Sequence, residues 1–363
     1  MTPASLEEVR RMAEWTPRLG VVSIYLRLDP ADRAGGWRTE LRNGLAAMLD
    51  GEASLDHETA AALRSTAERI GERFANHERS LPRGEAGFVE VAARAGEETW
   101  WPSHVEPSAG ALVEFGERAL IAPLIHLLER GSPRGVALLS AERVRLLDWA
   151  PGRIEELHSW ELSVFSGDWR ERKSQRVADP ARAQGVSASG RDQFDERLEE
   201  SRHHFLGECG RLTAQIAPRR GWTKLVLFGT GEHRNEFESG IPSGELTVQT
   251  GDGADLISEP AGRLEGPIAE AAERLDAAGE IELVERAIRE AQGGRRGTAG
   301  VQETEAALGE GRVESLVFDA ARAAEFEQMV RRALESGAAL AAVSGEGAER
   351  LASVGGVAAM LRY

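Results

Sequence analysis

The sequence contains a single cysteine, Cys209, among 363 residues. One cysteine forms no internal disulfide and builds no cysteine-based zinc cluster. A run of about 18 apolar residues, as a membrane-spanning helix would need, is also absent. The amino-terminal stretch MTPASLEEVRRMAEWT is charged and helical in pattern, which is not typical of a signal sequence. We therefore expect a soluble cytoplasmic protein that does not use a membrane as a partner.

The formal net charge is −16, which argues against a protein whose whole surface binds a polyanion. Basic residues nevertheless gather in and around two stretches, WRERKSQRVADPARA and GRLTAQIAPRRGWTK. The candidates for contacts to nucleic-acid phosphates are Arg170, Arg172, Lys173, Arg176, Arg182, Arg202, Arg211, Arg219, Arg220 and Lys224. Phosphate contacts need charge and reach rather than base-edge geometry, so loose arginine groups suffice. The alternative is a solvated helix face balanced by Glu199, Glu200 and Glu208.

The chain is longer than one hydrophobic core usually supports, and helices alternate with short apolar strands along it. Alternating apolar and polar residues predict a strand at 20–29, and apolar residues at helical spacing predict a helix at 36–50. We therefore expect an α/β fold of three small α/β domains. Their expected bounds are 1–165, 170–276 and 277–363, with a charged linker or extended loop at 166–190.

In the middle domain, one apolar stripe predicts a helix that begins near Phe194. The stripe consists of Phe194, Leu198, Phe205, Cys209, Leu212 and Ile216. Cys209 is expected to be a small core residue rather than a nucleophile. The adjacent His203 and His204 would point about 100° apart on a helix and share no metal. After the strand 225–228, the stretch FGTG has glycines but no nucleotide-binding motif, so we expect a turn there and predict neither a metal nor a cofactor.

The last residues, SGEGAERLASVGGVAAMLRY, contain an EG pair, a glycine pair and a terminal LRY in that order. This stretch resembles the end of the third domain of archaeo-eukaryotic peptide release factors. GVQETEAALGEGRVESLVF resembles the helix, turn and strand that precede it in the same domain. SIYLRLD and IAPLIHLLERG are similar to the first domain of the bacterial branch, which includes Balon-like ribosome hibernation factors and Vms-like release factors. Gly355 and Gly356 would permit positive φ or close backbone approach before the last strand.

The resemblance implies an RNase H-like middle domain and a carboxyl-terminal domain similar to the kink-turn-RNA-binding ribosomal-protein fold. In this family the middle domain opens with a long loop that carries GGQ, and here that loop would be residues 178–193. GGQ is absent, and Ser187, Ala188 and Ser189 stand in its place, between Gly185 and Gly190. The nearby glutamines, Gln184 and Gln193, do not follow two glycines. Loss of the glycines puts ester hydrolysis in doubt, because their backbone shape helps an amide to position water.

The first domain also has no NIKS stretch and no YxCxxxF element, so stop-codon reading is not expected. The resemblance then implies binding in the ribosomal A site for hibernation, stress protection or rescue, by steric occupancy rather than chemistry. The basic residues would contact ribosomal RNA or tRNA, and the third domain would dock a translational GTPase. One alternative is a peptidyl-tRNA hydrolase in which Gln184 or Gln193 replaces the family glutamine. Another is an interaction protein that keeps the fold and acts independently of ribosomes.

Overall fold

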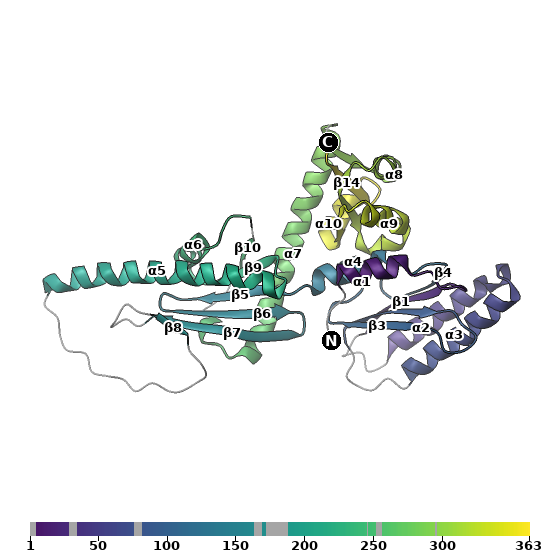
Figure 1. Ribbon diagram of the computed structural model, residues 1–363, viewed down its shortest axis with the longest axis horizontal. Coiled ribbons are helices and arrows are strands. Elements are labelled where there is room, and N and C mark those ends of the chain that lie inside the picture. The colour runs from purple at the N-terminus through teal and green to yellow at the C-terminus, as the bar shows by residue number, and fades with distance from the viewer. Residues whose placement is uncertain are drawn as a thin grey trace. The chain divides into compact units, whose positions relative to one another are not determined.

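The computed structural model describes residues 5–28, 35–75, 82–162, 169–171, 188–244, 246–251, 256–294 and 296–363. The chain divides into two units. The first combines Met1–Gly131 with Ala277–Tyr363, and the second is Ser132–Asp276. Within the described residues the fold is mixed α/β, with two four-stranded sheets and one six-stranded sheet (Figure 1).

The amino-terminal part of the first unit is a four-stranded sheet with both faces covered. Its elements are α1 (Leu6–Glu14), β1 (Val21–Arg27), α2 (Gly36–Asp50), a 3-10 helix (Gly51–Ser54), α3 (His57–Ala75), β2 (Gly84–Glu90), β3 (Glu98–Ser103), β4 (Leu112–Gly116) and α4 (Ala122–Gly131). The strand order is β3-β2-β1-β4, and β1 is antiparallel to both neighbours. Helices α2 and α3 bury Trp37 and Phe74 against Val22, while α1 and α4 cover Tyr25 on the other face. The predictions of a strand at 20–29 and a helix at 36–50 are confirmed by β1 and α2.

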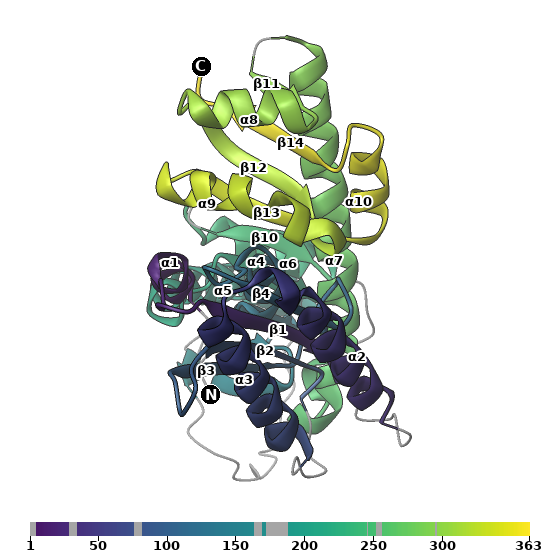
Figure 2. The same cartoon turned by 90° about the vertical axis from the view of Figure 1, so that its right-hand side faces the viewer.

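The carboxyl-terminal part of the first unit is a second four-stranded sheet, with order β11-β14-β12-β13. Its elements are the last turns of α7 (Ala261–Gln292), β11 (Gly297–Ala299), α8 (Val301–Gly309), β12 (Val313–Asp319), a 3-10 helix (Ala320–Phe326), α9 (Glu327–Glu335), β13 (Ala339–Val343), α10 (Gly345–Ala352) and β14 (Val357–Leu361). Helices α7 and α10 pack on one face of this sheet, and α8 and α9 pack on the other (Figure 2). Gly355 and Gly356 have φ of +88° and +84°, as their sequence position predicted.

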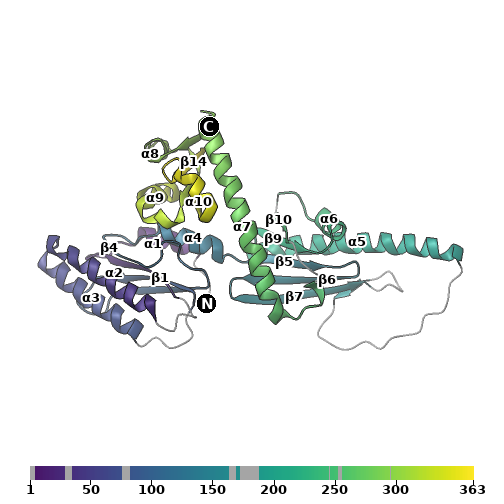
Figure 3. The same ribbon diagram turned by 180° about the vertical axis from the view of Figure 1, so that it is seen from behind.

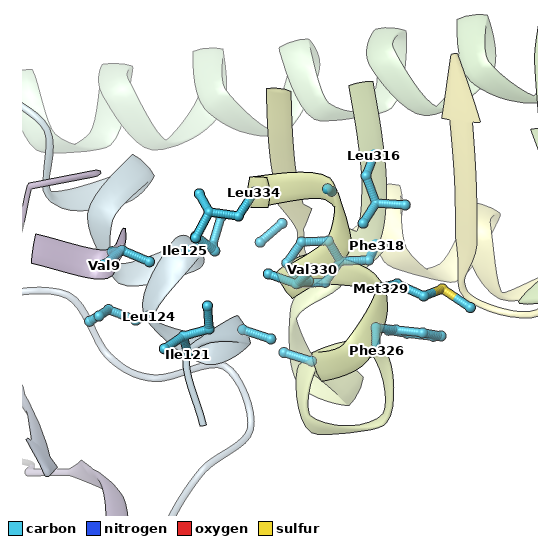
Figure 4. Packing of buried hydrophobic residues seen from close by; sticks show 14 of the residues in the cluster. Val9, Ile121, Leu124, Ile125, Leu316, Phe318, Phe326, Met329, Val330 and Leu334 are labelled. Carbon is cyan, nitrogen blue, oxygen red and sulfur yellow. The ribbon is translucent and has the colours of Figure 1, made fainter. Parts of the chain in front are cut away.

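Within the first unit, α4 joins the two sheets through a shared apolar cluster. Figure 4 shows Ile121 and Ile125 facing Val330 and Leu334 of α9. A buried polar contact adds to this packing, because a carboxylate oxygen of Glu327 accepts hydrogen bonds from the amides of Ile121 and Ala122, at 3.0 and 2.8 Å. The α4 amino terminus is thus capped by a side chain from α9, about 200 residues later in the chain.

The same helix also lies against β13, the edge strand of the carboxyl-terminal sheet. A Glu129 carboxylate oxygen accepts a hydrogen bond of 3.0 Å from the Ala342 amide. His126 is buried beside this contact, with only 6% of its surface exposed, and its Nδ1 has no hydrogen-bond partner among the described residues. Burial, with the nearby charge of Arg130, lowers the pKa of His126 to about 4, so the imidazole is neutral at physiological pH.

The second unit is built on a six-stranded sheet of order β10-β9-β5-β6-β7-β8. Its elements are β5 (Arg134–Leu139), β6 (Arg143–Ala150), β7 (Arg153–Leu162), β8 (Trp169–Glu171), α5 (Ala188–Arg220), β9 (Lys224–Phe228), α6 (Gly231–Ser239), β10 (Thr247–Thr250), a 3-10 helix (Leu256–Ser258) and the first turns of α7. Strands β5, β6 and β7 form an antiparallel meander, and β9 and β10 continue the sheet parallel to β5. This arrangement agrees with the RNase H-like topology that the family resemblance implies.

Two helices sandwich this sheet. Helix α5 lies on one face, where Phe205 and Cys209 contact Leu146 and Leu227, and α7 lies on the other, where Leu264 and Ile268 are buried. Figure 1 shows the sheet from the α5 side and Figure 3 from the α7 side. No helix in the described ranges is both long and apolar enough to cross a bilayer.

The domain boundary expected at residue 165 differs from the division in the structure. Strands β5, β6 and β7 were assigned to the first domain, but they belong to the second unit, which begins at Ser132. The reason is the parallel pairing of β5 with β9, in which Gly135 lies opposite Leu225. The two strands of a hairpin can be predicted from the local sequence pattern. The pairing of β5 with β9, whose paired residues are 90 positions apart in the sequence, gives no such local pattern.

Candidate functional site

Helix α5 is the dominant feature of the second unit and carries most of the sequence-predicted site residues. It is 33 residues long, and its amino-terminal part extends past the ends of the strands (Figure 1). The carboxyl-terminal half is anchored by a stripe in which Phe205 and Cys209 are fully buried and Leu212 and Ile216 are partly buried. These four residues confirm the predicted stripe, whereas the side chains of Phe194 and Leu198 lie outside the described part of the structure.

Helix α6 braces α5 through a contact that only glycine permits. A Cβ at Gly240 would lie 1.8 Å from the carbonyl oxygen of Gly207, and one at Gly210 would lie 2.0 Å from that of Phe237. The two backbones therefore touch directly. One turn earlier on α5, Nδ1 of His203 lies 3.2 Å from a carboxylate oxygen of Glu236 on α6. These contacts set the spacing between α5 and α6 from His203 to Gly210.

The loop was predicted at 178–193, but α5 already begins at Ala188, and residues 178–187 lie outside the described part of the structure. Ala188, Ser189, Gly190 and Gln193 are therefore helical, and the prediction of a loop at these positions was wrong. The polar composition of this stretch favours a loop. However, the stretch is continuous with the part of α5 that packs on the sheet, so the helix extends into it without a new nucleation step. Outside the described residues lie Arg172, Lys173, Arg176, Arg182, Gln184, Gly185 and Ser187, while Arg170 is described only as backbone in β8.

The basic candidates with described side chains mostly pair with carboxylates of their own unit. Arg202 donates to Glu142 at 2.6 Å, and Arg211 donates to Glu208 at 2.9 Å, one turn earlier on α5. Arg220 and Lys224 contact buried acids, as described below. Arg219 is exposed, and no carboxylate of the described residues lies within ion-pairing distance of it.

Lys224 belongs to a buried ionic cluster at the beginning of β5. Two guanidinium nitrogens of Arg134 donate to the two carboxylate oxygens of Asp276, at 3.1 and 2.9 Å, and Lys224 Nζ donates to the same carboxylate at 2.7 Å. Arg134 is 2% exposed and its guanidinium lies 5.3 Å from the centre of the Trp149 ring. Burial by itself would raise the pKa of Asp276, but Arg134 and Lys224 outweigh it, so the pKa is lowered and the carboxylate stays charged.

Arg220 belongs to a second cluster, centred on Asp148 of β6. The Asp148 carboxylate is 3% exposed and accepts from Trp222 Nε1 at 2.9 Å, from Arg153 at 3.1 Å and from Arg220 at 3.4 Å. This cluster ties the end of α5 to the sheet. Arg220 and Lys224 therefore have structural partners, which reduces their availability for phosphates.

Sequence reasoning did not single out Arg134, Asp148 or Asp276. The available signal was weak: Arg134 and Asp148 are lone charges at or within apolar strands, in SPRGVALL and RLLDWA. A charged side chain is buried only when it is paired. The sequence therefore predicts that each of these residues has a partner, but it does not indicate which residue that partner is.

The remaining candidates carry no catalytic chemistry that the structure supports. Cys209 is fully buried, and burial raises the pKa of its thiol, which keeps it protonated and inert. A Cβ at Gly229, whose φ is +147°, would lie 2.9 Å from the Leu139 carbonyl oxygen, and Thr230 caps α6, so FGTG is a strand-to-helix turn. Across the parts of the chain that the structure describes, no three His, Cys, Asp or Glu side chains are grouped as a metal site would require.

Comparison with known proteins finds a family match for one part of the chain. Residues 120–261 match the family described as Bacterial archaeo-eukaryotic release factor family 10. This segment includes α4, the whole six-stranded sheet, α5 and α6. The match covers 142 of the 363 residues, which is less than half of the chain. This part of the chain is similar to the bacterial branch of the archaeo-eukaryotic release factors.

The solved structures that match this chain share little sequence with it. Archaeal translation termination factor aRF1 is 20% identical, with 99% of both chains covered and a TM-score of 0.27. Archaeoglobus fulgidus Pelota is 14% identical, with 100% of this chain and 94% of that chain covered and a TM-score of 0.36. Archaeal Pelota from a ribosome-bound complex with ABCE1 is 15% identical, over 100% and 95% of the chains, with a TM-score of 0.42. No curated protein matches the sequence.

Proposed function

We propose that this protein is a ribosome-associated, release-factor-like factor that occupies the A site without reading a stop codon. The observation that carries the proposal is the family match over residues 120–261, which covers the sheet and the long helix of the second unit. The settings proposed are hibernation, stress protection or rescue of ribosomes in the cytoplasm. The absence of NIKS and YxCxxxF elements from the sequence supports the lack of stop-codon reading.

In this proposal the second unit acts by occupancy rather than by ester hydrolysis. Positioning water at a peptidyl-tRNA ester would require the special backbone shape that two glycines allow. Here Ala188 and Ser189, which stand in the GGQ region, have helical backbone at the start of α5. Occupying the A site requires an element that is long enough to extend into it, and it does not require the backbone shape of a catalytic loop. The part of α5 that extends past the strands supports this role (Figure 1).

The proposed RNA contacts are made by the basic residues that precede α5 and by those on its surface. Arg219 is the strongest candidate among the described side chains, because it is exposed and is not held by a carboxylate. Arg170, Arg172, Lys173, Arg176 and Arg182 belong to the same proposal. The carboxyl-terminal sheet is proposed to dock a translational GTPase, a role that rests on the family resemblance of its last residues.

Sedimentation with purified ribosomes tests the proposal. The protein should co-sediment at low salt and dissociate as salt rises, because phosphate contacts release counterions. Arg219→Glu should weaken binding and lower the salt slope by about 1. Arg263→Glu is the matched control, since Arg263 is 78% exposed on α7 and lies 3.8 Å from Glu259. Failure to co-sediment at low salt would leave an interaction protein that acts independently of ribosomes.

A peptide-release assay on stalled ribosomes distinguishes occupancy of the A site from hydrolysis of peptidyl-tRNA. Ribosomes that carry peptidyl-tRNA should retain the peptide when the protein is added. Release of peptide that is lost in Gln193→Ala or Gln184→Ala would instead support a peptidyl-tRNA hydrolase and overturn the occupancy proposal.

A further inference from the structure

A polar cavity lies wholly within the first unit and is not used by the proposed function. Its volume is about 550 Å³, which falls inside the range of about 300 to 1,000 Å³ that is typical of small-ligand sites. The cavity is lined by residues of β1 and β4, by the segment 116–120 that leads into α4, and by α9. Because these elements are far apart in the sequence, the cavity is a product of the tertiary structure.

The lining of the cavity is fixed by buried hydrogen bonds. The Leu120 amide donates to Ser23 Oγ at 2.8 Å, and the Leu120 carbonyl accepts from the Tyr25 hydroxyl at 2.5 Å. On the side of α9, Arg331 is 5% exposed and donates to the Ala119 carbonyl. The charge of Arg331 is balanced by a carboxylate within α9, so it is not available to a ligand. A ligand therefore meets a preformed surface, which lowers the ordering cost of binding.

Three exposed charged side chains also line the cavity. Glu114 of β4 lies directly opposite Ser23 of β1, so the two side chains share one face of the sheet. Glu117 and Arg118 follow β4 in the sequence. Among the described residues, none of these three charged side chains has an ion-pair or hydrogen-bond partner. Charges of both signs can therefore contact a ligand.

The Ser23 hydroxyl adds a buried donor to this lining. Ser23 is 1% exposed, and its Oγ accepts from the Leu120 amide. Within the described ranges, no residue accepts the proton of this hydroxyl group. Buried polar groups are nearly always satisfied, so this donor indicates an acceptor that the chain itself does not supply.

The charges in the lining define the chemical class of the ligand. No three described His, Cys, Asp or Glu side chains are grouped as a metal site requires, so a metal ion does not account for the two carboxylates. Two carboxylates and one guanidinium complement two cationic groups and one anionic group. A basic α-amino acid has this combination, with an α-ammonium group, a side-chain cation and an α-carboxylate.

We propose that the cavity binds a basic α-amino acid such as arginine or lysine. Arg118 and the Ser23 hydroxyl donate to the α-carboxylate, and Glu114 and Glu117 accept from the two cationic groups. These are charge-assisted hydrogen bonds, which are roughly twice as strong as neutral ones. The site lies in the first unit and does not depend on the RNA contacts proposed for the second unit.

Isothermal titration calorimetry of the full chain tests the ligand class. L-Arginine and L-lysine should bind with one molecule per chain. In L-citrulline a neutral ureido group replaces the guanidinium, and agmatine lacks the carboxylate. Each analogue should bind at least about tenfold more weakly than L-arginine, because each loses one charge-assisted contact. Absence of binding by both basic amino acids at millimolar concentration, or an affinity for either analogue equal to that for L-arginine, would overturn the proposal.

Substitutions in the lining test the assigned residues. Glu117→Gln should weaken L-arginine binding about tenfold, and Arg118→Gln should remove the preference for L-arginine over agmatine. Glu305→Gln is the matched control, because Glu305 is exposed on α8 and does not line the cavity. All three side chains are exposed, so thermal unfolding of each variant should match that of the wild type. Unchanged binding in Glu117→Gln, unchanged selectivity in Arg118→Gln, or an equal loss of binding in Glu305→Gln would contradict the assignment.

Discussion

The buried His126 should make the first unit lose stability in mild acid. In the folded state its pKa is lowered to about 4 from the ordinary value of 6.5, chiefly by burial and then by the charge of Arg130. A histidine with a lowered folded pKa contributes stability that is fully present above pH 6.5 and is lost as the pH falls through 4. The unfolded chain accepts the proton first, which favours unfolding across this window.

The magnitude follows from the difference between the two pKa values. A difference of 2.5, obtained as 6.5 minus 4, corresponds to a limit of about 3.4 kcal/mol at 1.36 kcal/mol per pH unit. At pH 5 the unfolded histidine is almost fully protonated and the folded one is mostly neutral, so about 2 kcal/mol of the free energy of unfolding is already lost. This is a substantial part of the stability of an ordinary domain.

Urea unfolding at pH 8 and pH 5 measures this loss. The wild-type protein should be less stable at pH 5, and His126→Gln should remove about 2 kcal/mol of the pH dependence because its side chain does not titrate. His204→Gln is the control, since His204 is exposed and stays hydrated in the folded state. If His126→Gln keeps the full wild-type pH dependence, the buried neutral state of this imidazole is refuted.

Three further changes test contacts within the units by thermal unfolding. Asp276→Asn leaves Arg134 buried without a countercharge and should cost about 3 to 5 kcal/mol; an unchanged melting temperature would show that the ion pair contributes nothing. Gly240→Ala places a methyl group 1.8 Å from the Gly207 carbonyl and should cost at least about 1 to 3 kcal/mol, whereas Gly231→Ala, with only a 4.0 Å contact, should be tolerated. Gly356→Ala puts alanine at φ of +84° and 2.5 Å from the Arg322 side chain, so it should cost about 1 to 2 kcal/mol or more; equal stability of this variant and Gly309→Ala would contradict the strain.

Local pattern was sufficient where a segment's neighbours along the chain determine its structure. The alternation in 20–29 and the helical spacing in 36–50 correspond to β1 and α2, and the apolar stripe of α5 is buried from Phe205 to Ile216. The carboxyl-terminal glycine pair has positive φ, because no other residue adopts that conformation without strain. The family resemblance was also readable there, since it depends on residue order alone.

The site was less predictable, because its charges depend on partners far away in the sequence. Nothing near Arg202 or Lys224 indicates that they pair with Glu142 and Asp276, so the sequence presented both as free cations. The start of α5 at Ala188 was missed for a related reason, since an anchored helix extends through residues whose own propensity favours a loop.

The sequence by itself determined the kind of elements, the family resemblance and the absence of the GGQ motif, because each of these depends on residue type and local order. Only the tertiary structure decided that β5 to β7 join β9 in one sheet, and that most of the described arginine candidates are held by acids. It also brought Arg130 beside Glu280 and Arg134 beside Asp276. These contacts close loops of more than 140 residues, and the free energy that selects them comes from burial and charge pairing, which no local pattern encodes.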